Sequence, residues 1–469
     1  MEEAAEAAKL NVVLFPWLAF GHMIPFLELA KRLAARGHAV TFLSTPRNVA
    51  RLPPVPAHLS PSIRLVALPA PTVEGLPEGA ESTADVPPEM NELIKKAVDG
   101  LAAPFSAFLA DAAAGGSKPD WMVIDFCYHW LPAIADEHKA ASIAFLGPRW
   151  ANAAARPCAA WEDFTAPPKW CPFPPAIAFR RHEAVWIAEA FRPNASGVSD
   201  LDRMWQIIER SRLIIFRSCD EVEPGVFPLL ADLFRRPAIP AGVLLQPDLD
   251  DGDGDSGSEA RPEVLQWLDN QPPKSVIYVA LGSEAPLTAS TVHELALGLE
   301  LAGVRFMWAF RKPAGTTAPD ADVAALLPAG FEERTRGRGL VWMGWVPQVR
   351  ALAHGAVAAF LTHCGWGSTI ESLVLGRPLV MLPFVADQGL VARTMAERGV
   401  GVEVARDDGD GSFGRDDVAA AVRRVMVEEE GKVFASNARK LKEVLCDHRR
   451  QDEYVDELVG YLRRYKDNS

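Results

Sequence analysis

The feature that most constrains the fold of this chain is a repeated pairing of a short apolar segment with a helical one. The apolar segments are rich in β-branched residues and almost continuously hydrophobic, which is typical of parallel strands covered on both faces. Strands that alternate with helices predict a doubly wound α/β sheet. The predicted strands are Asn11–Phe15, Ala39–Ser44, Ile63–Ala67, Trp121–Asp125 and Ser142–Leu146 in the first half, and Ser275–Leu281, Arg305–Phe310, Leu340–Trp345, Ala358–Thr362 and Pro378–Leu382 in the second.

The first helix has clear start and stop signals. Pro25 suits a first helical turn, apolar residues recur at helical spacing after it, and Gly37 ends the pattern. This interpretation leaves His22 in a loop between the first strand and the first helix.

An acidic run of Gly, Ser and Asp, residues 248–260, separates the two halves and predicts a flexible linker. Three of its aspartates have the spacing of a calcium loop. However, Ser256 stands where that loop needs glycine, and Pro262 stands where it needs a bidentate glutamate. The run therefore does not predict a calcium site.

Composition narrows the class of protein further. The 469 residues fit about three domains, or two large α/β domains. Lys and Arg number 48 against 61 Asp and Glu, a net charge of −13, which argues against nucleic acid or an anionic membrane as partner. No apolar run approaches the roughly 20 residues of a membrane span. The acidic N-terminus and six scattered cysteines without a CxxC pair predict a cytoplasmic protein with reduced thiols.

A doubly wound sheet raises the possibility of a dinucleotide-binding oxidoreductase. No G-x-G-x-x-G follows a predicted strand and no P-loop is present, so that alternative is disfavoured but stays open. The densest segment runs instead from Trp345 to Gln388. In its middle, a strand ends at a glycine turn that opens a helix, and such a helix N-terminus suits a diphosphate.

The whole of this segment resembles the plant secondary-product glycosyltransferase box, the donor-site signature of the family-1 UDP-glycosyltransferases. It begins Trp-Val-Pro-Gln, contains Thr-His-Cys-Gly-Trp-Gly-Ser-Thr-Ile-Glu, and closes Asp-Gln. The resemblance covers essentially the full chain and implies a GT-B fold, in which two Rossmann-like domains face a cleft. It implies an acceptor-binding domain over 1–247, the linker over 248–260, a UDP-sugar-binding domain over 261–450, and a C-terminal helix over 451–469 that packs back on the first domain.

The resemblance also assigns the donor site. It implies that Trp345 stacks on the uracil, that Gln348 contacts the uridine and that Glu371 accepts hydrogen bonds from the ribose. His363, Ser368 and Ser283 would hold the diphosphate, and Trp366, Asp387 and Gln388 would face the sugar. The implied donor-binding set is Gly21, Ser283, Trp345, Val346, Gln348, His363, Gly365, Trp366, Gly367, Ser368, Glu371, Asp387 and Gln388.

The catalytic pair implied by the resemblance is His22 with Asp125. Each follows or ends a predicted strand, where ligands bind in open α/β sheets. A neutral imidazole can remove a hydroxyl proton near pH 7, while a carboxylate fixes its tautomer. The implied reaction is a single inverting displacement that needs neither metal nor cofactor.

The acceptor is less well defined. The loop 74–85 resembles one in the branch that adds sugar to sugar, including enzymes of terpenoid and flavonoid glycosides. This predicts a glycosylated apolar acceptor, such as a steviol glycoside or a flavonoid glycoside, with glucose from UDP-glucose. The expected acceptor contacts are Phe20, Glu81, Ser82, Thr83, Phe126 and Trp150.

Several alternatives stay open from the sequence. Gly367 stands where the family usually has Asn, which leaves the donor sugar open between UDP-glucose and UDP-rhamnose. The acceptor could also be a bare aglycone. Another GT-B enzyme, such as an epimerase or a phosphorylase, and a catalytically silent UDP-sugar-binding protein are weaker alternatives. The protein is expected to act as a monomer.

Overall fold

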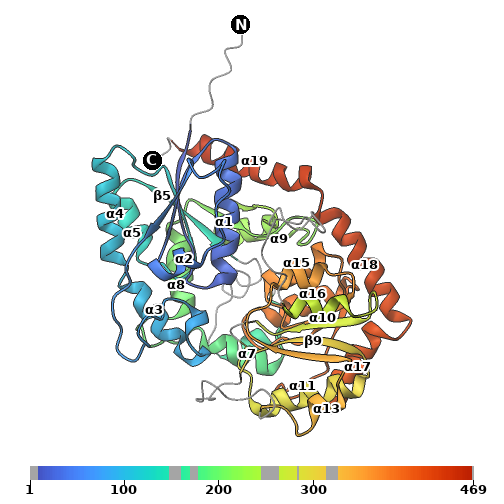
Figure 1. Ribbon diagram of the computed structural model, residues 1–469. Coiled ribbons are helices and arrows are strands. Elements are labelled where there is room, and N and C mark those ends of the chain that lie inside the picture. Colours follow the sequence, from blue (N-terminus) through green and yellow to red (C-terminus); the bar gives the residue numbers. More distant parts are fainter. Residues whose placement is uncertain are drawn as a thin grey trace. The chain divides into compact units, whose positions relative to one another are not determined.

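The structure, a computed structural model, describes residues 9–146, 160–168, 178–244, 263–282, 285–312 and 326–466. The chain forms two compact units (Figure 1). Unit 1 comprises Met1–Pro157, Glu189–Leu245 and Asp447–Ser469, and unit 2 comprises Cys158–Ala188 and Gln246–Cys446. The predicted linker, residues 248–260, lies outside the described residues.

Unit 1 is built on a parallel sheet with the strand order β3-β2-β1-β4-β5-β6-β7. In Figure 1, α4 and α5 lie on one side of this sheet and α1 on the other. The strands are β1 (Asn11–Phe15), β2 (Ala39–Ser44), β3 (Ile63–Ala67), β4 (Trp121–Ile124), β5 (Ala141–Leu146), β6 (Leu213–Phe216) and β7 (Ala238–Pro240). The helices are α1 (Phe20–Ala35), α2 (Pro46–Arg51), η1 (Thr83–Asp85), η2 (Pro88–Met90), α3 (Asn91–Asp99), α4 (Ala102–Ala114), α5 (Leu131–Glu137), α8 (Asp200–Arg210), α9 (Val226–Phe234) and α19 (His448–Tyr465).

Unit 2 repeats this plan with the parallel order β10-β9-β8-β11-β12-β13. The strands are β8 (Val276–Ala280), β9 (Arg305–Phe310), β10 (Gly339–Met343), β11 (Val357–Thr362), β12 (Leu379–Met381) and β13 (Gly401–Glu403). The helices are η3 (Trp161–Phe164), α7 (Arg181–Glu189, whose last residue falls in unit 1), α10 (Glu263–Asp269), α11 (Ala289–Ala302), α13 (Phe331–Arg334), α14 (Gln348–Ala353), α15 (Trp366–Val374), α16 (Gln388–Glu397), α17 (Arg415–Met426) and α18 (Glu430–Leu445).

Both sheets reverse their strand order at one point. In unit 1 the first strand, β1, lies between β2 and β4, and in unit 2 β8 lies between β9 and β11. Right-handed crossovers in opposite directions from such a strand leave a crevice at its carboxyl end, and ligands of open α/β sheets bind there. The fold therefore predicts one site after β1 and β4, and another after β8 and β11.

The last helix, α19, belongs to unit 1. Val455, Leu458 and Leu462 are buried in the core of that unit, and the Trp121 indole donates a hydrogen bond to the carbonyl of Leu462 at 3.0 Å. At the exposed edge of the contact between α1 and α19, Arg36 donates to Asp456 at 2.5 Å. The end of the sequence thus closes one face of the first sheet (Figure 1).

The ten predicted strands are all present, with shifts of one or two residues at their ends, but three more complete the sheets. The strands β6, β7 and β13 are three or four residues long. A proline in β7, and a glycine and a glutamate in β13, interrupt the apolar pattern of those two strands. The segment Cys158–Ala188 also groups with unit 2, although it lies within the predicted first domain, 1–247.

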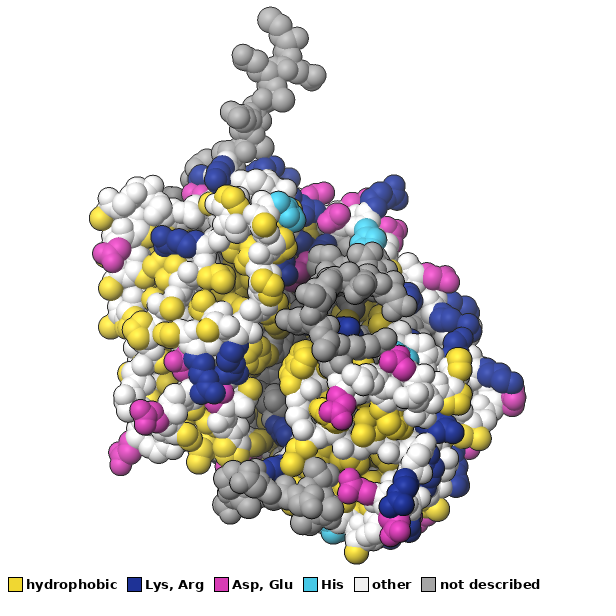
Figure 2. Space-filling model, viewed as in Figure 1, with side chains coloured by type: hydrophobic (Ala, Val, Ile, Leu, Met, Phe, Trp, Pro, Cys, Tyr) yellow, Lys and Arg dark blue, Asp and Glu magenta, His cyan; other side chains and the backbone are white. Residues whose placement is uncertain are grey.

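Surface charge is mixed in sign. Figure 2 shows Lys and Arg side chains interspersed with Asp and Glu over the visible face of unit 2. One helical stretch, Pro88–Ala114, passes a test of length and composition for a membrane span, a test that core helices of water-soluble proteins also pass. It is broken into η2, α3 and α4.

Candidate active site

The site of unit 1 is built around a hydrogen bond between His22 and Asp125. The Nδ1 atom of His22 lies 2.7 Å from Oδ2 of Asp125. The same Oδ2 accepts the backbone N–H of Trp17 at 3.0 Å, and Oδ1 accepts that of Phe126 at 2.8 Å. Asp125 is 2% exposed, whereas the side chain of His22 is 43% exposed. The carboxylate is therefore fixed, and the ring that it orients reaches the surface.

This geometry suits a general base. When Nδ1 donates its proton to the carboxylate, the neutral ring carries its lone pair on Nε2. A proton taken up at Nε2 creates an imidazolium, which the adjacent carboxylate stabilises. The pair occupies the predicted position, because β1 and β4 are neighbours and each residue follows one of them.

The prediction that His22 lies in a loop is wrong. His22 is in the first turn of α1, which begins at Phe20, five residues before Pro25. The N–H groups of His22 and Met23 both bond to the carbonyl of Ala19, at 2.9 Å each, so the helix starts without the proline. Pro25 lies inside the helix and has no N–H to donate to the carbonyl of Gly21, so one bond of the helix is missing there.

Three further residues predicted for this site, Phe126, Phe20 and Gly21, are described by the structure. The ring of Phe126 lies 6.0 Å from that of His22. Phe20 is half-buried, and the Arg51 guanidinium lies 4.6 Å from its ring centre. Gly21 is exposed, with open space where a side chain would project. Trp150 lies outside the described residues.

The predicted acceptor loop is held together by its own polar groups. Oδ2 of Asp85 accepts the hydroxyl of Ser82 at 2.8 Å and its N–H at 2.9 Å, and Arg51 donates to Asp85 at 2.8 Å. Glu81 accepts the backbone N–H of Arg47 at 2.7 Å. Ser82 and Thr83 are buried. These side chains therefore stabilise the loop against α2.

Sequence reasoning missed Arg203, which supports the segment after Asp125. Its guanidinium is fully buried and makes a two-pronged ion pair with Asp99, at 2.7 and 2.6 Å. It also donates to the carbonyl of Cys127 at 2.9 Å and contacts Nδ1 of His129 at 3.1 Å. The one available signal was an arginine on the otherwise apolar face of a strongly amphipathic helix, α8.

The site of unit 2 surrounds the N-terminus of α15. Thr362 ends β11, Cys364 has a left-handed backbone with φ of 67°, and Gly365 caps the helix. The ring of His363 fits between two glycines. A Cβ atom at Gly282 or at Gly365 would lie 2.5 Å from its Nε2. Only glycine at both positions allows this packing, so the ring is held against the loops after β8 and β11.

Burial, with a smaller contribution from the charge of Arg311, lowers the pKa of His363 to about 4. The ring is therefore neutral at pH 7 and acts toward an anion as an N–H donor, not as a cation. The positive charge is that of Arg311, which directly follows β9. Sequence reasoning missed Arg311. Its position just past the carboxyl end of a strand beside β8 was the available signal.

Three predicted donor residues lie together. The amide nitrogen of Gln348 donates to Glu371 at 2.7 Å and to the hydroxyl of Ser368 at 3.1 Å. Trp345 is 80% exposed, which is unusual for an indole and suits a ring available for stacking, whereas Val346 is buried. The structure thus brings Gln348, Ser368 and Glu371 into one cluster.

Gln388, at the end of the segment that begins at Trp345, stabilises the loop before it. Gln388 is 6% exposed, and its Oε1 accepts the N–H groups of Phe384 at 2.9 Å and Val385 at 3.1 Å. Only its NH2 group is then suited to a ligand. Asp387 caps α16, and Trp366 and Gly367 are the first residues of α15. Ser283 lies outside the described residues.

No group of three or more His, Cys, Asp and Glu side chains is arranged to hold a metal ion within the described ranges.

Comparison with known proteins decides the family. A model described as UDP-glucuronosyl and UDP-glucosyl transferase matches residues 253–455. UDP-glycosyltransferase 91D1 of Stevia rebaudiana is 43% identical over 97% of this chain and 93% of its own length. The chain belongs to the plant family-1 UDP-glycosyltransferases. It is therefore an enzyme that transfers a glycosyl group from a UDP-sugar.

A further sequence relative and a solved structure are also similar to the chain. The soyasaponin III rhamnosyltransferase of Glycine max is 36% identical over 97% of this chain and 96% of its own. Among solved structures, that of Phytolacca americana apo UGT2 has a TM-score of 0.76 and 25% identity, and covers 97% of this chain and 99% of that one. These likenesses confirm the predicted GT-B fold.

Proposed function

We propose that this glycosyltransferase transfers glucose from UDP-glucose, with inversion, to a hydroxyl group on the sugar of a small apolar glycoside. The observation that carries the proposal is the 2.7 Å contact between His22 and Asp125 at the switch point of the first sheet. A silent UDP-sugar-binding protein would have no use for an oriented base at that place.

The proposed reaction is one displacement. Nε2 of His22 takes the proton of the acceptor hydroxyl as its oxygen attacks the anomeric carbon of the donor. The new C–O bond forms as the bond from that carbon to the diphosphate oxygen breaks, and UDP leaves. Asp125 stabilises the imidazolium that results. Attack from the face opposite the leaving group inverts the anomeric centre.

Unit 2 would stabilise the leaving diphosphate with groups of its own. The N-terminus of α15 favours an anion through the helix dipole, His363 offers a neutral donor, and Arg311 offers a positive charge. These groups replace a metal in the proposal. Activity is expected to persist in excess EDTA, whereas a complete loss that Mg²⁺ or Mn²⁺ restores would contradict the proposal.

A glycoside as acceptor is supported by the resemblance of the loop 74–85 and by the name of the Glycine max relative, whose substrate is a saponin. The polar groups of Glu81, Ser82 and Asp85 stabilise the loop itself and Thr83 is buried, so the aromatic residues Phe20, Phe126 and Trp150 are the better candidates for direct contact. A steviol glycoside or a flavonoid glycoside is the first acceptor to test.

The test compares kcat/KM for an aglycone and its monoglucoside and determines the product linkage by NMR. We expect a preference for the monoglucoside and a sugar–sugar bond. Preference for the aglycone, with glucose attached directly to it, would contradict this part of the proposal.

UDP-rhamnose is the second candidate donor. It is favoured by the rhamnosyltransferase named above and by Gly367, which departs from the usual Asn. Competition between the two donors, read by the mass of the product, separates them. A monomeric state and a cytoplasmic location stay predictions from the sequence.

A further inference from the structure

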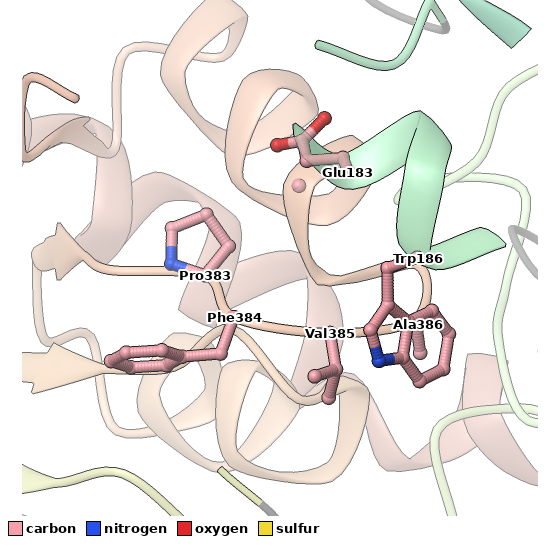
Figure 3. A pocket seen from close by; sticks show the side chains of 7 residues that line it. Glu183, Trp186, Pro383, Phe384, Val385 and Ala386 are labelled. Carbon is pink, nitrogen blue, oxygen red and sulfur yellow. The ribbon is translucent and has the colours of Figure 1, made fainter. Parts of the chain in front are cut away.

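A helix from the first half of the sequence lies in the donor unit. The helix α7 begins at Arg181, and the chain leaves unit 2 for unit 1 after Ala188. Glu183 and Trp186 of this helix line a small pocket together with Pro383, Phe384, Val385, Ala386 and Gly389. Figure 3 shows both side chains projecting from α7 beside the loop that carries residues 383–386.

Glu183 makes a buried ion pair with α16. Its side chain is 7% exposed, and Arg393 donates to its two oxygens at 3.0 and 2.7 Å. The backbone N–H of Arg180 also donates to it, at 2.9 Å. Burial acts to raise the pKa of Glu183, but the hydrogen bonds and charge of Arg393 outweigh it and lower that pKa, so the pair stays ionised.

The same carboxylate lies against the backbone of Gly389. A Cβ atom on Gly389 would come within 2.1 Å of Oε1 of Glu183. Because real atoms cannot approach so closely, any larger residue at 389 would displace either the carboxylate or the first turn of α16. A carboxylate at this helix N-terminus is also favoured by the helix dipole.

Two of the three predicted sugar-facing residues, Asp387 and Gln388, belong to this turn. Asp387 caps α16 and Gln388 is its first residue. Gln388 in turn holds the N–H groups of Phe384 and Val385. On the other side of the loop, Arg406 donates to the carbonyl of Pro383 and lies 5.3 Å from the ring centre of Phe384. A shift of the α16 N-terminus would therefore move the whole loop.

We infer that Glu183 is a positioning residue for recognition of the donor sugar, acting through Arg393 and Gly389 on Asp387 and Gln388. The inference rests on the proposed function, because it takes these two residues as contacts of the transferred sugar. The inference gives α7, which lies outside the segment from Trp345 to Gln388, a role in selecting the donor sugar. Contacts to uridine, made around Trp345 and Glu371, do not depend on this turn.

The test measures three quantities for wild type, Glu183→Gln, Glu183→Ala, Gly389→Ala and the double variant Glu183→Ala/Gly389→Ala. They are kcat/KM for UDP-glucose, the ratio of that value to the one for UDP-galactose, and the Kd for UDP. Glu189→Gln, at the exposed end of α7, is the matched control.

Each single variant should lower both kcat/KM for UDP-glucose and the discrimination ratio by about tenfold, because small misplacements of binding groups are costly. The Kd for UDP should stay within about twofold of wild type. In the double variant the carboxylate is gone, so adding the Gly389 methyl group should cause almost no further loss, in contrast to its effect alone. Glu189→Gln should behave as wild type.

Equal changes in UDP and UDP-glucose binding would overturn the inference, since they indicate general loss of structure. An unchanged discrimination ratio, or a Gly389→Ala effect that is as large without Glu183 as with it, would also overturn it. If Glu183→Ala does not fold, Glu183→Gln still compares the discrimination ratio with the Kd for UDP. A wild-type enzyme that transfers no sugar from UDP-glucose would instead contradict the proposed function.

Discussion

Two histidines lie near the strand reversals of the two sheets and have opposite environments. His22 follows β1 and His363 follows β11, each at the strand reversal of its sheet. His22 is 43% exposed and paired with a buried carboxylate. His363 is packed between glycines, Nδ1 makes no hydrogen bond to the described residues, and burial with Arg311 lowers its pKa to about 4.

The fold sets the position of each histidine, whereas the neighbouring side chains determine which protonation state of its ring is favoured. A carboxylate stabilises the protonated form of an imidazole, so His22 is suited to take a proton during turnover. Burial beside a cation stabilises the neutral form, so His363 is suited to donate a hydrogen bond without changing charge. We therefore assign proton transfer to unit 1 and donor binding to unit 2.

The largest effect is expected for His22→Ala. Loss of a general base typically lowers the rate 10²–10⁴-fold, so kcat with UDP-glucose should fall by about that factor. Steady-state assays measure it, with His58→Ala, an exposed histidine of the same unit, as the control. Turnover of His22→Ala near that of the control would contradict the assignment of proton transfer to unit 1.

Trp345→Ala should weaken donor binding by unit 2. Stacking of a base on an aromatic ring contributes roughly 1–3 kcal/mol, so the Kd for UDP should rise by about one to two orders of magnitude. Because the indole is 80% exposed, the melting temperature should barely change. Calorimetry with UDP gives the answer, with the exposed Val427→Ala as control. Unchanged affinity would show that the uracil does not lie on this ring.

The fold was predictable because its signals are local. Long apolar runs such as Trp121–Asp125 and Arg305–Phe310 identified central strands correctly. Edge strands were missed because β7 contains a proline and β13 combines a glycine with a glutamate, so neither shows an apolar run. The start of α1 was misplaced because Pro25 is a strong start signal and the turn before it has no side-chain cap.

In the candidate site, only residues that belong to a recognised sequence motif could be predicted. Neighbouring strands made His22 and Asp125 meet, as the pattern predicted. The neutral state of His363 could not be predicted, because it follows from packing against Gly282 and from a charge on another strand. Arg203 and Glu183 act through partners that are 104 and 210 residues away in the sequence, and no local pattern reveals such pairs.

The pH dependence of stability sharpens the contrast between the histidines. The pKa of His363 is about 4 in the folded chain, against about 6.5 for an unfolded histidine. The unfolded chain therefore binds the proton first, and stability is lost as pH falls from about 6.5 toward 4. His363→Gln lacks this loss.

Urea unfolding at pH 7 and pH 5 should show that wild type loses about 1–2 kcal/mol more than His363→Gln over this interval. Identical pH dependence of the two proteins would mean that His363 titrates normally. That result would remove the proposed difference from His22.

The smallest effect is expected for Gly367→Asn, which restores the usual residue of the family at the second position of α15. The donor KM, or the ratio of UDP-glucose to UDP-rhamnose use, should change by more than about twofold, equivalent to roughly 0.4 kcal/mol. The acceptor KM should change less. Steady-state kinetics with both donors measures these values, and no change in either donor quantity would make this departure neutral.

The most direct test of the division between the units is the UDP affinity of His22→Ala and Trp345→Ala measured side by side by calorimetry, together with the turnover of each. We expect His22→Ala to bind UDP as wild type does while its turnover is lost, and Trp345→Ala to bind UDP weakly. Loss of UDP affinity in His22→Ala, with full affinity in Trp345→Ala, would contradict the assignment of proton transfer to unit 1 and donor binding to unit 2.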